Sequence, residues 1–266
     1  MTNSGLEDLF SNMEREAHAA LKIAAAAISA LRKFHSAAQL GNLKDLRKNI
    51  DFADQTVMQL KEQIEKARAS WTLNDEEYLA GHAAALEFLN AAEEAGLKMF
   101  ELDERLYCHP FLIRTLPEEG AVLIDKSLEK RIRPSFLIKY LKQLQEKPSK
   151  FKPETFLECL FECYEVLSAA RGKGTTRNGT VVKLKEIYRL LTLLPGQNKN
   201  YSIQEFARDI YLLDKSLVNR TKKGFKVQFP ADTGTKTKNP LSVITEDGIE
   251  KIYYGISFSY QQETAT

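Results

Sequence analysis

The chain has 266 residues, enough for one large domain or two modest ones. Its 43% hydrophobic content is typical of a protein with a buried core, and no apolar run reaches the roughly 18 residues of a membrane helix. The opening MTNSGLED has no basic segment followed by an apolar one, so we expect no secretory signal. Three cysteines are too few for a disulfide scaffold. We therefore expect a cytoplasmic protein with reduced thiols and no membrane association.

The net charge of +2 hides an uneven distribution of charged residues. Residues 171–239 hold 15 Lys and Arg against 5 Asp and Glu, a balance of +10. Residues 1–170 hold 22 against 27, a balance of −5, and residues 240–266 add 1 against 4. This asymmetry predicts an acidic partner for the basic part, with nucleic acid among the options. A solvated surface, or docking on the protein's own acidic half, remains an open alternative.

Two regular apolar patterns in the first 70 residues predict a pair of long helices. Their steps alternate between three and four residues, which is typical of a coiled-coil-like pair. The short break at Gly41 and Asn42 predicts an antiparallel hairpin, and Ser4 with Glu7 predicts a capping box at its start. The alanine-rich first seam buries little area, so we expect the hairpin to need a further helix or a partner. The expected seams are Leu6, Phe10, Met13, Ala17, Ala20, Ala24, Ala27, Leu31 and Phe34, and Leu43, Leu46, Ile50, Ala53, Val57, Leu60, Ile64 and Ala67.

The middle of the chain is expected to be helical. A third helix is predicted from Asn74, with Glu77 at the reciprocal capping position, to about Leu106. Prolines interrupt residues 107–125, where the sequence VLI fits a short strand or a helical turn equally well. Pro134 and Pro153 each open a further helix. The glycine-rich linker at 171–180 then separates a helical domain, residues 1–170, from a second domain, residues 180–260.

The second domain is expected to combine helices with a β-ribbon. VVKLKEIYRLLTLLP reads as a helix, and a capping box of Ser202 and Glu205 starts another that runs to about Leu217. Three strands are predicted, in GFKVQF, LSVIT and IEKIYYGISF, with Asp247-Gly248 as a hairpin turn. This order of elements resembles a winged-helix domain over about 80 residues, although no sharp turn is evident between two helices before the ribbon. The predicted fold class is mainly α: a long antiparallel coiled-coil-like hairpin, a helical middle region and a winged-helix-like α+β module.

Basic residues gather at the ends of the first predicted strand. FPADTGTKTKNP, residues 229–240, is expected to form the tip between two strands of the ribbon. Lys and Arg on such loops suit phosphate contacts, which give affinity without reading sequence. The predicted nucleic-acid-binding residues are Arg220, Lys222, Lys223, Lys226, Lys236 and Lys238. Partner carboxylates are the alternative target.

Motifs of catalysis and cofactor binding are absent. The string GTKT lacks the Gly-Lys pair of a nucleotide-binding loop, and strand rather than helix is predicted after it. Cys108, His109, Cys159 and Cys163 do not follow a zinc spacing, and the sequence leaves open whether they meet in space. We therefore assign no catalytic, cofactor or metal residues and expect no small-molecule substrate.

These features together predict a non-catalytic accessory or adaptor subunit. Its helical part would dock on a larger protein, and its basic C-terminal module would contact DNA or a second partner. N-terminal helices followed by a winged helix resemble the plan of small subunits that bridge SMC-type ATPases, including those of bacterial genome-maintenance and phage-defence systems. Two alternatives remain: a free-standing DNA-binding winged-helix regulator that dimerises through its helical arm, and an enzyme whose site no motif reveals.

Overall fold

The structure is a computed structural model that describes residues 5–147, 151–170, 179–230 and 240–260. It is mainly helical, with two long helices and an antiparallel sheet region toward the C-terminus. None of the helices in these ranges has the length and apolar character needed to cross a membrane. Residues 171–178 of the linker predicted at 171–180 lie outside the described residues. Two compact units are present: Met1–Ala91 with Leu116–Ala121 and Lys130–Leu137, and Ala92–Thr115 with Val122–Glu129 and Ile138–Thr266.

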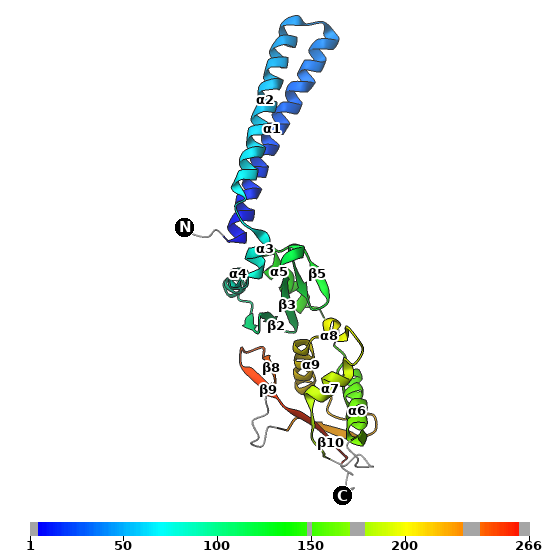
Figure 1. Ribbon diagram of the computed structural model, residues 1–266. Helices are drawn as coiled ribbons and strands as arrows, with labels where there is room; N and C mark the ends of the chain where they lie inside the picture. Colours follow the sequence, from blue (N-terminus) through cyan, green and yellow to red (C-terminus); the bar gives the residue numbers. More distant parts are fainter. Residues whose placement is uncertain (1–4, 148–150, 171–178, 231–239, 261–266) are drawn as a thin grey trace. The chain divides into compact units, whose positions relative to one another are not determined.

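The first unit contains the predicted helical hairpin. Helices α1 (Leu6–Leu40) and α2 (Leu43–Ser70) lie side by side and run in opposite directions (Figure 1). Gly41 ends α1 in the left-handed conformation, with φ of 69°, which glycine adopts without steric cost. The Asn42 side chain accepts the Asp45 N–H at 3.2 Å and so caps α2. The two predicted helices and the break between them are confirmed.

The two helices pack through small residues, but the residues at their interface differ in part from the predicted seams. Helix α1 buries Ala27, Ala30 and Ala37, and α2 buries Ala53 and Thr56. The buried and half-buried positions of α2 continue along Leu46, Asn49, Ala53, Thr56, Leu60, Gln63, Ala67 and Ser70. Half of the predicted α2 seam is therefore wrong, because the helix turns polar positions inward and leaves apolar ones outside.

The predicted third helix is shorter than expected. Asn74 accepts the Glu77 N–H at 3.4 Å, so the predicted start is confirmed, but α3 (Asp75–Ala80) ends at Gly81 and α4 (His82–Glu94) follows it. The chain then turns at Gly96, whose φ is 67°. Residues 100–108 form strands joined by a two-residue turn, Asp103 and Glu104, both with positive φ. A helix to Leu106 is therefore wrong.

A five-stranded sheet occupies the middle region that we expected to be helical. Its strands follow one another in chain order, and the β1–β2, β2–β3 and β4–β5 pairs are antiparallel. The ambiguous VLI lies in a strand. The strands are only three to six residues long, so their alternation is easily missed. They are β1 (Phe100–Leu102), β2 (Arg105–Cys108), β3 (Phe111–Leu116), β4 (Ala121–Ile124) and β5 (Ser127–Glu129), and the short helix η1 (Pro117–Glu119) precedes β4.

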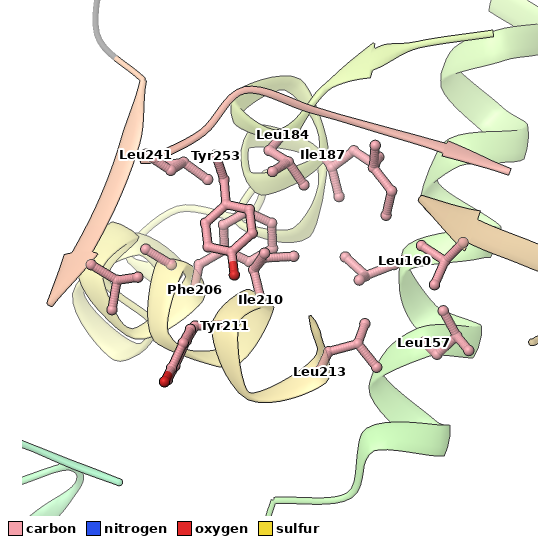
Figure 2. Packing of buried hydrophobic residues seen from close by; sticks show 14 of the residues in the cluster. Leu157, Leu160, Leu184, Ile187, Phe206, Ile210, Tyr211, Leu213, Leu241 and Tyr253 are labelled. Atoms are coloured by element: carbon pink, nitrogen blue, oxygen red, sulfur yellow. The ribbon is translucent and has the colours of Figure 1, made fainter. Parts of the chain in front are cut away.

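The C-terminal helices follow the predicted starts. Pro134 and Pro153 open α5 (Pro134–Gln145) and α6 (Pro153–Ala170), and the Ser202–Glu205 capping box opens α9 (Ile203–Lys215). The preceding helical pattern, VVKLKEIYRLLTLLP, divides into β6 (Val182–Lys183) and α7 (Leu184–Leu191), and the short helix α8 (Gln197–Asn200) follows it. Helices α6, α7 and α9 pack around one core, shown in Figure 2, with Phe206, Ile210 and Leu213 on the inner face of α9.

The first two predicted C-terminal strands are present, but the third, IEKIYYGISF, divides into two strands that lie in different sheets. The four strands are β7 (Phe225–Gln228), β8 (Leu241–Ile244), β9 (Glu250–Tyr253) and β10 (Gly255–Tyr260). Strand β7 pairs with β10 in a β6–β10–β7 sheet, whereas β8 and β9 form a separate hairpin through the predicted Asp247-Gly248 turn. Strands β7 and β8, which flank the predicted tip at residues 229–240, therefore do not pair with each other. Residues 231–239 lie outside the described part.

Candidate partner-docking and nucleic-acid surfaces

Helix α2 carries an exposed apolar stripe along its length, which we call the α2 stripe. Leu43, Ile50, Val57 and Ile64 follow at seven-residue intervals, and 67%, 43%, 50% and 48% of their surfaces are exposed. A seven-residue interval keeps side chains on one face of a helix. All four were predicted to pack inside the hairpin. Exposed apolar side chains gathered on one face are a common feature of protein-interaction surfaces.

Helix α1 also leaves large apolar side chains outside. Leu21 and Ile28 are seven residues apart and are 68% and 51% exposed, and the predicted seam residue Leu31 is 47% exposed. The hairpin interface itself uses alanines, which bury little area per residue. The hairpin therefore exposes more large apolar side chains than it buries between its two helices.

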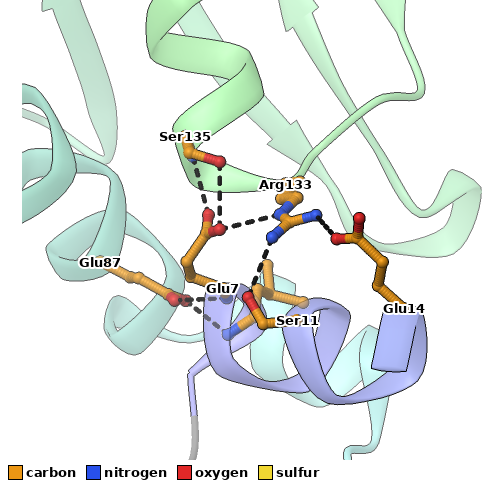
Figure 3. A network of polar contacts seen from close by, with 7 residues as sticks. Glu7, Ser11, Glu14, Glu87, Arg133 and Ser135 are labelled. Carbon is orange, nitrogen blue, oxygen red and sulfur yellow. Dashed lines mark hydrogen bonds and ion pairs between the residues drawn. The ribbon is translucent and has the colours of Figure 1, made fainter. Parts of the chain in front are cut away.

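A network of carboxylates anchors the base of the hairpin, as Figure 3 shows. Glu87 of α4 accepts the N–H groups of Leu6 and Glu7 at 2.8 and 2.9 Å and so caps α1. The Glu7 carboxylate in turn accepts the N–H and hydroxyl of Ser135 at 2.9 and 3.0 Å, which caps α5. Arg133 donates to Glu7 at 2.8 Å. Each helix start is thus capped by a carboxylate from another helix.

This network replaces the predicted capping box at the chain start. The residue at the N-cap position of α1 is Gly5, without a side-chain cap, and Ser4 lies outside the described residues. The Glu7 side chain is bound to Ser135 and Arg133 and does not close a local box. Burial acts to raise the pKa of Glu7, but hydrogen bonds from Ser135 and Arg133 outweigh it and lower the pKa below its usual value.

Four of the predicted nucleic-acid-binding residues lie together in one tight turn between α9 and β7, which we call the basic turn. Arg220 and Lys226 pair as an isolated antiparallel bridge, and Lys222 and Lys223 lie between them. The turn closes through the Thr221 N–H to the Phe225 carbonyl at 2.9 Å and the Gly224 N–H to the Thr221 carbonyl at 2.9 Å.

Helix α6 supplies acidic neighbours to this turn. The Lys223 ammonium pairs with Glu165 at 3.1 Å and lies 5.3 Å from the centre of the Phe161 ring, and the Lys222 backbone N–H donates to Glu158 at 2.6 Å. Within the described part of the chain, the Arg220 guanidinium and the Lys222 ammonium have no ion pair or hydrogen bond. These two cations are therefore available to an outside anion. Lys236 and Lys238 lie outside the described residues.

A second basic surface at the free end of the hairpin escaped the sequence analysis. Residues 32–48 hold five Lys and Arg against one acidic residue, Asp45, but the charge summed over residues 1–170 is negative. Because α1 ends at Leu40 and α2 begins at Leu43, all five cations lie within about 12 Å of the connecting turn along the helices. They are Arg32, Lys33, Lys44, Arg47 and Lys48, and all are exposed.

The cysteines and histidines considered for zinc do not form a metal centre in the described ranges, where no three His, Cys, Asp or Glu side chains are placed to hold an ion. Cys108 is buried, and burial raises the pKa of its thiol to about 12. Cys159 and Cys163 form a side-chain hydrogen bond with each other on α6, and this bond lowers the pKa of the Cys159 thiol. The His109 ring contacts the Ile244 carbonyl.

Comparison with known proteins adds no relative: no family model, no curated protein and no solved structure matches this chain.

Proposed function

We propose that this protein is a non-catalytic adaptor subunit of a larger assembly. Its helical hairpin docks on helices of a larger protein through the α2 stripe, and its C-terminal module contacts DNA through the basic turn. The α2 stripe is the observation that carries this proposal, because a row of exposed apolar side chains at heptad spacing fits a partner helix. A coiled-coil ATPase of the SMC type, in genome maintenance or phage defence, is the partner class that this arrangement suits.

The arrangement of the C-terminal module supports a winged-helix-like reading. Three helices, α6, α7 and α9, surround one core. Strand β6 lies between α6 and α7, β7 and β10 follow α9, and β10 is in the centre of the sheet. In this reading α7 and α9 are the two helices before β7, and α8 lies in the connection between them, whereas the sequence showed no turn within the helix predicted from Ser202 to Leu217. The β8–β9 hairpin is then an insertion before the last strand.

The charges of α9 argue against sequence-specific DNA reading. In winged helices of the DNA-binding type, the second helix of the pair enters the major groove. Here α9 has two cations and three carboxylates, and its Arg208 donates to the neighbouring Asp209 at 2.8 and 3.0 Å. A helix with this balance suits protein contacts better than phosphates. DNA contact through the basic turn alone gives affinity with little sequence preference.

A free-standing DNA-binding regulator remains the second candidate. The same α2 stripe could be covered by the hairpin of a second copy, which would make the arm a dimeriser. The two candidates differ in what the stripe binds, a different protein or the same chain.

The test replaces Ile50 and Val57 by glutamine in the full-length protein, expressed with a tag in its native host. The matched control replaces Phe52 and Met58, two exposed apolar residues of α2 outside the stripe. Burial of two such side chains stabilises a complex by about 3 kcal/mol or more, so the stripe variant should lose at least ~100-fold in affinity. Light scattering of the purified material gives the mass of the complex, and mass spectrometry identifies its components.

The outcomes separate the candidates. A complex with a different, larger protein that the stripe variant loses and the control variant keeps supports the adaptor. A dimer of this chain that becomes monomeric only in the stripe variant supports the regulator. A stable monomer that recovers no partner, with or without the substitutions, contradicts both.

A further inference from the structure

A third positively charged feature lies in a pocket of about 320 Å³ within the second unit. Strands β2 and β3 and the β4–β5 turn form one wall, and α8 with the first turn of α9 forms the other. The pocket holds four cations, Arg105, Arg114, Lys126 and Lys199, and two carboxylates. The cations come from four separate elements of the chain, so only the tertiary fold brings them together.

Two of these cations, Arg105 and Arg114, lie opposite each other on neighbouring strands. The β2–β3 register pairs Leu106 with Ile113, and its continuation places Arg105 opposite Arg114. Like charges directly opposite each other on antiparallel strands are destabilising. Burial lowers the pKa of Arg105, and the nearby Arg114 charge lowers it further. Within the described residues neither guanidinium has a hydrogen bond or an ion pair, although Arg105 lies in the field of Glu205 and Glu104.

The two carboxylates of the pocket are engaged by other groups. Asp125 accepts the Leu112 N–H at 3.1 Å and pairs with Arg208. Glu205 accepts the Ser202 N–H at 2.7 Å in the capping box of α9. Lys126 lies 5.8 Å from the centre of the Tyr201 ring and, like Lys199, has no carboxylate partner in the described part of the chain. The pocket is therefore a concave site with excess positive charge.

The lining also defines the chemical class of the ligand. A guanidinium presents a planar fork of donors that matches the oxygens of a phosphate, and two forks side by side suit a dianion. Leu112 and Leu123 line the same pocket and provide an apolar surface beside the cations. A volume of about 320 Å³ is at the small end of pockets that hold organic ligands.

We propose that this pocket binds a small organic phosphate of nucleoside monophosphate size, with its phosphate between Arg105 and Arg114 and its remaining part against Leu112 and Leu123. The bound phosphate relieves the repulsion between the two arginines. The site is separate from the basic turn and does not depend on DNA contact. A backbone phosphate of a nucleic acid strand is the other source of the same chemical group, and the experiment distinguishes the two.

The test measures binding to the full-length protein by calorimetry, with AMP, UMP, ribose 5-phosphate, inorganic phosphate and an oligothymidylate as probes. The variant is Arg105→Gln with Arg114→Gln, and the matched control is Arg189→Gln, an exposed arginine of α7 outside the pocket. We expect at least one organic phosphate to bind more tightly than inorganic phosphate, and the double variant to bind it at least tenfold more weakly than the control. Because repulsion is removed, ligand-free Arg114→Gln should melt at or above the wild-type temperature.

Four results would overturn the proposal. The first is that no organic phosphate binds at about 1 mM, the weak end of ligand affinity, and the second is that inorganic phosphate binds as tightly as the organic phosphates. The third is that the double variant binds the organic phosphate as well as the control does. The fourth is that the oligothymidylate displaces the mononucleotide, which would assign the site to a nucleic acid strand. A lower melting temperature of ligand-free Arg114→Gln would mean that Arg114 stabilises the fold and is not held for a ligand.

Discussion

At the scale of single residues, carboxylates act as helix caps from a distance. Glu87 binds the first N–H groups of α1, and Glu7 binds those of α5, although each lies far along the chain from its target. The first N–H groups of a helix lack partners within it, and a carboxylate there also complements the helix dipole. Gly5 leaves room for this arrangement, since a Cβ at that position would lie 2.4 Å from a Glu87 oxygen.

The Glu7 network can be tested by removing one negative charge. Glu7→Gln should lower the free energy of unfolding by about 1–2 kcal/mol at pH 7, because it weakens charge-assisted hydrogen bonds from Ser135 and Arg133 at a partly exposed site. The folded pKa of Glu7 is lowered, so its contribution is present above its unfolded pKa of about 4.3 and is lost as the pH falls through the folded value. Urea unfolding of wild type and variant across this pH range measures the difference.

Glu14→Gln is the matched control, because Glu14 pairs with the same Arg133 at 2.8 Å but 71% of its side chain is exposed. Exposed ion pairs contribute little, so we expect a cost under about 0.5 kcal/mol. Equal costs for the two variants, or a Glu7 effect that persists in acid, would contradict the assigned role.

At the scale of elements, the hairpin depends on the small size of its inner residues. Ala30 is 1% exposed between α1 and α2, and the neighbouring inner positions of α2 include Ala53 and Thr56. The Thr56 hydroxyl is satisfied within its own helix by the Phe52 and Ala53 carbonyls. Small residues let the two helices approach closely, and the large apolar side chains then remain outside, where a partner is expected.

This close approach predicts that a larger inner residue is not tolerated. Ala30→Leu should lower the free energy of unfolding by about 1–3 kcal/mol through overpacking, although the helix propensity of leucine is nearly that of alanine. Ala25→Leu, at an exposed position of the same helix, should change it by less than about 0.5 kcal/mol. Urea unfolding followed by circular dichroism at 222 nm, the standard helix signal, gives both values. A neutral Ala30→Leu would show that the helices are not in close contact there.

At the scale of the whole molecule, charge is concentrated on a few surfaces. The basic turn and the pocket of Arg105 and Arg114 lie in the second unit, and the basic end of the hairpin lies in the first. The basic turn falls in the segment with a balance of +10, whereas the hairpin end, Arg105 and Arg114 fall in residues 1–170, whose balance is −5 and conceals them. The net charge of +2 alone would not indicate any of them.

DNA contact through the basic turn predicts a defined salt dependence. Arg220→Glu with Lys222→Glu should weaken binding uniformly across DNA sequences and reduce the slope of log affinity against log salt by about 2, because each phosphate contact contributes about 0.9. Fluorescence anisotropy with two unrelated duplexes at several salt concentrations measures both effects. The matched charge reversal is Lys44→Glu with Lys48→Glu at the hairpin end. Loss of binding only in that second variant would assign the DNA contact to the hairpin end. Binding retained by both variants would contradict contact through either surface, and no binding by the wild type would exclude DNA as a partner.

The sequence determined the parts of this protein in which local signals agree. The two long helices, the break at Gly41, the helix starts at Pro134, Pro153 and Ser202 and the Asp247-Gly248 hairpin were all predicted, because caps, prolines and turn residues act within a few positions. The clustering of Arg220, Lys222, Lys223 and Lys226 also follows from their closeness in sequence.

Only the tertiary structure decided which positions face inward and which strands pair. A shift of one position around α2 exchanges Val57 for Thr56 at the interface, and the close fit of alanines favours that exchange over the apolar pattern. The five short strands and the pairing of β7 with β10 depend on contacts between distant residues, which no local pattern contains. The opposition of Arg105 and Arg114 follows from that sheet, so a helix prediction across residues 74–106 concealed it.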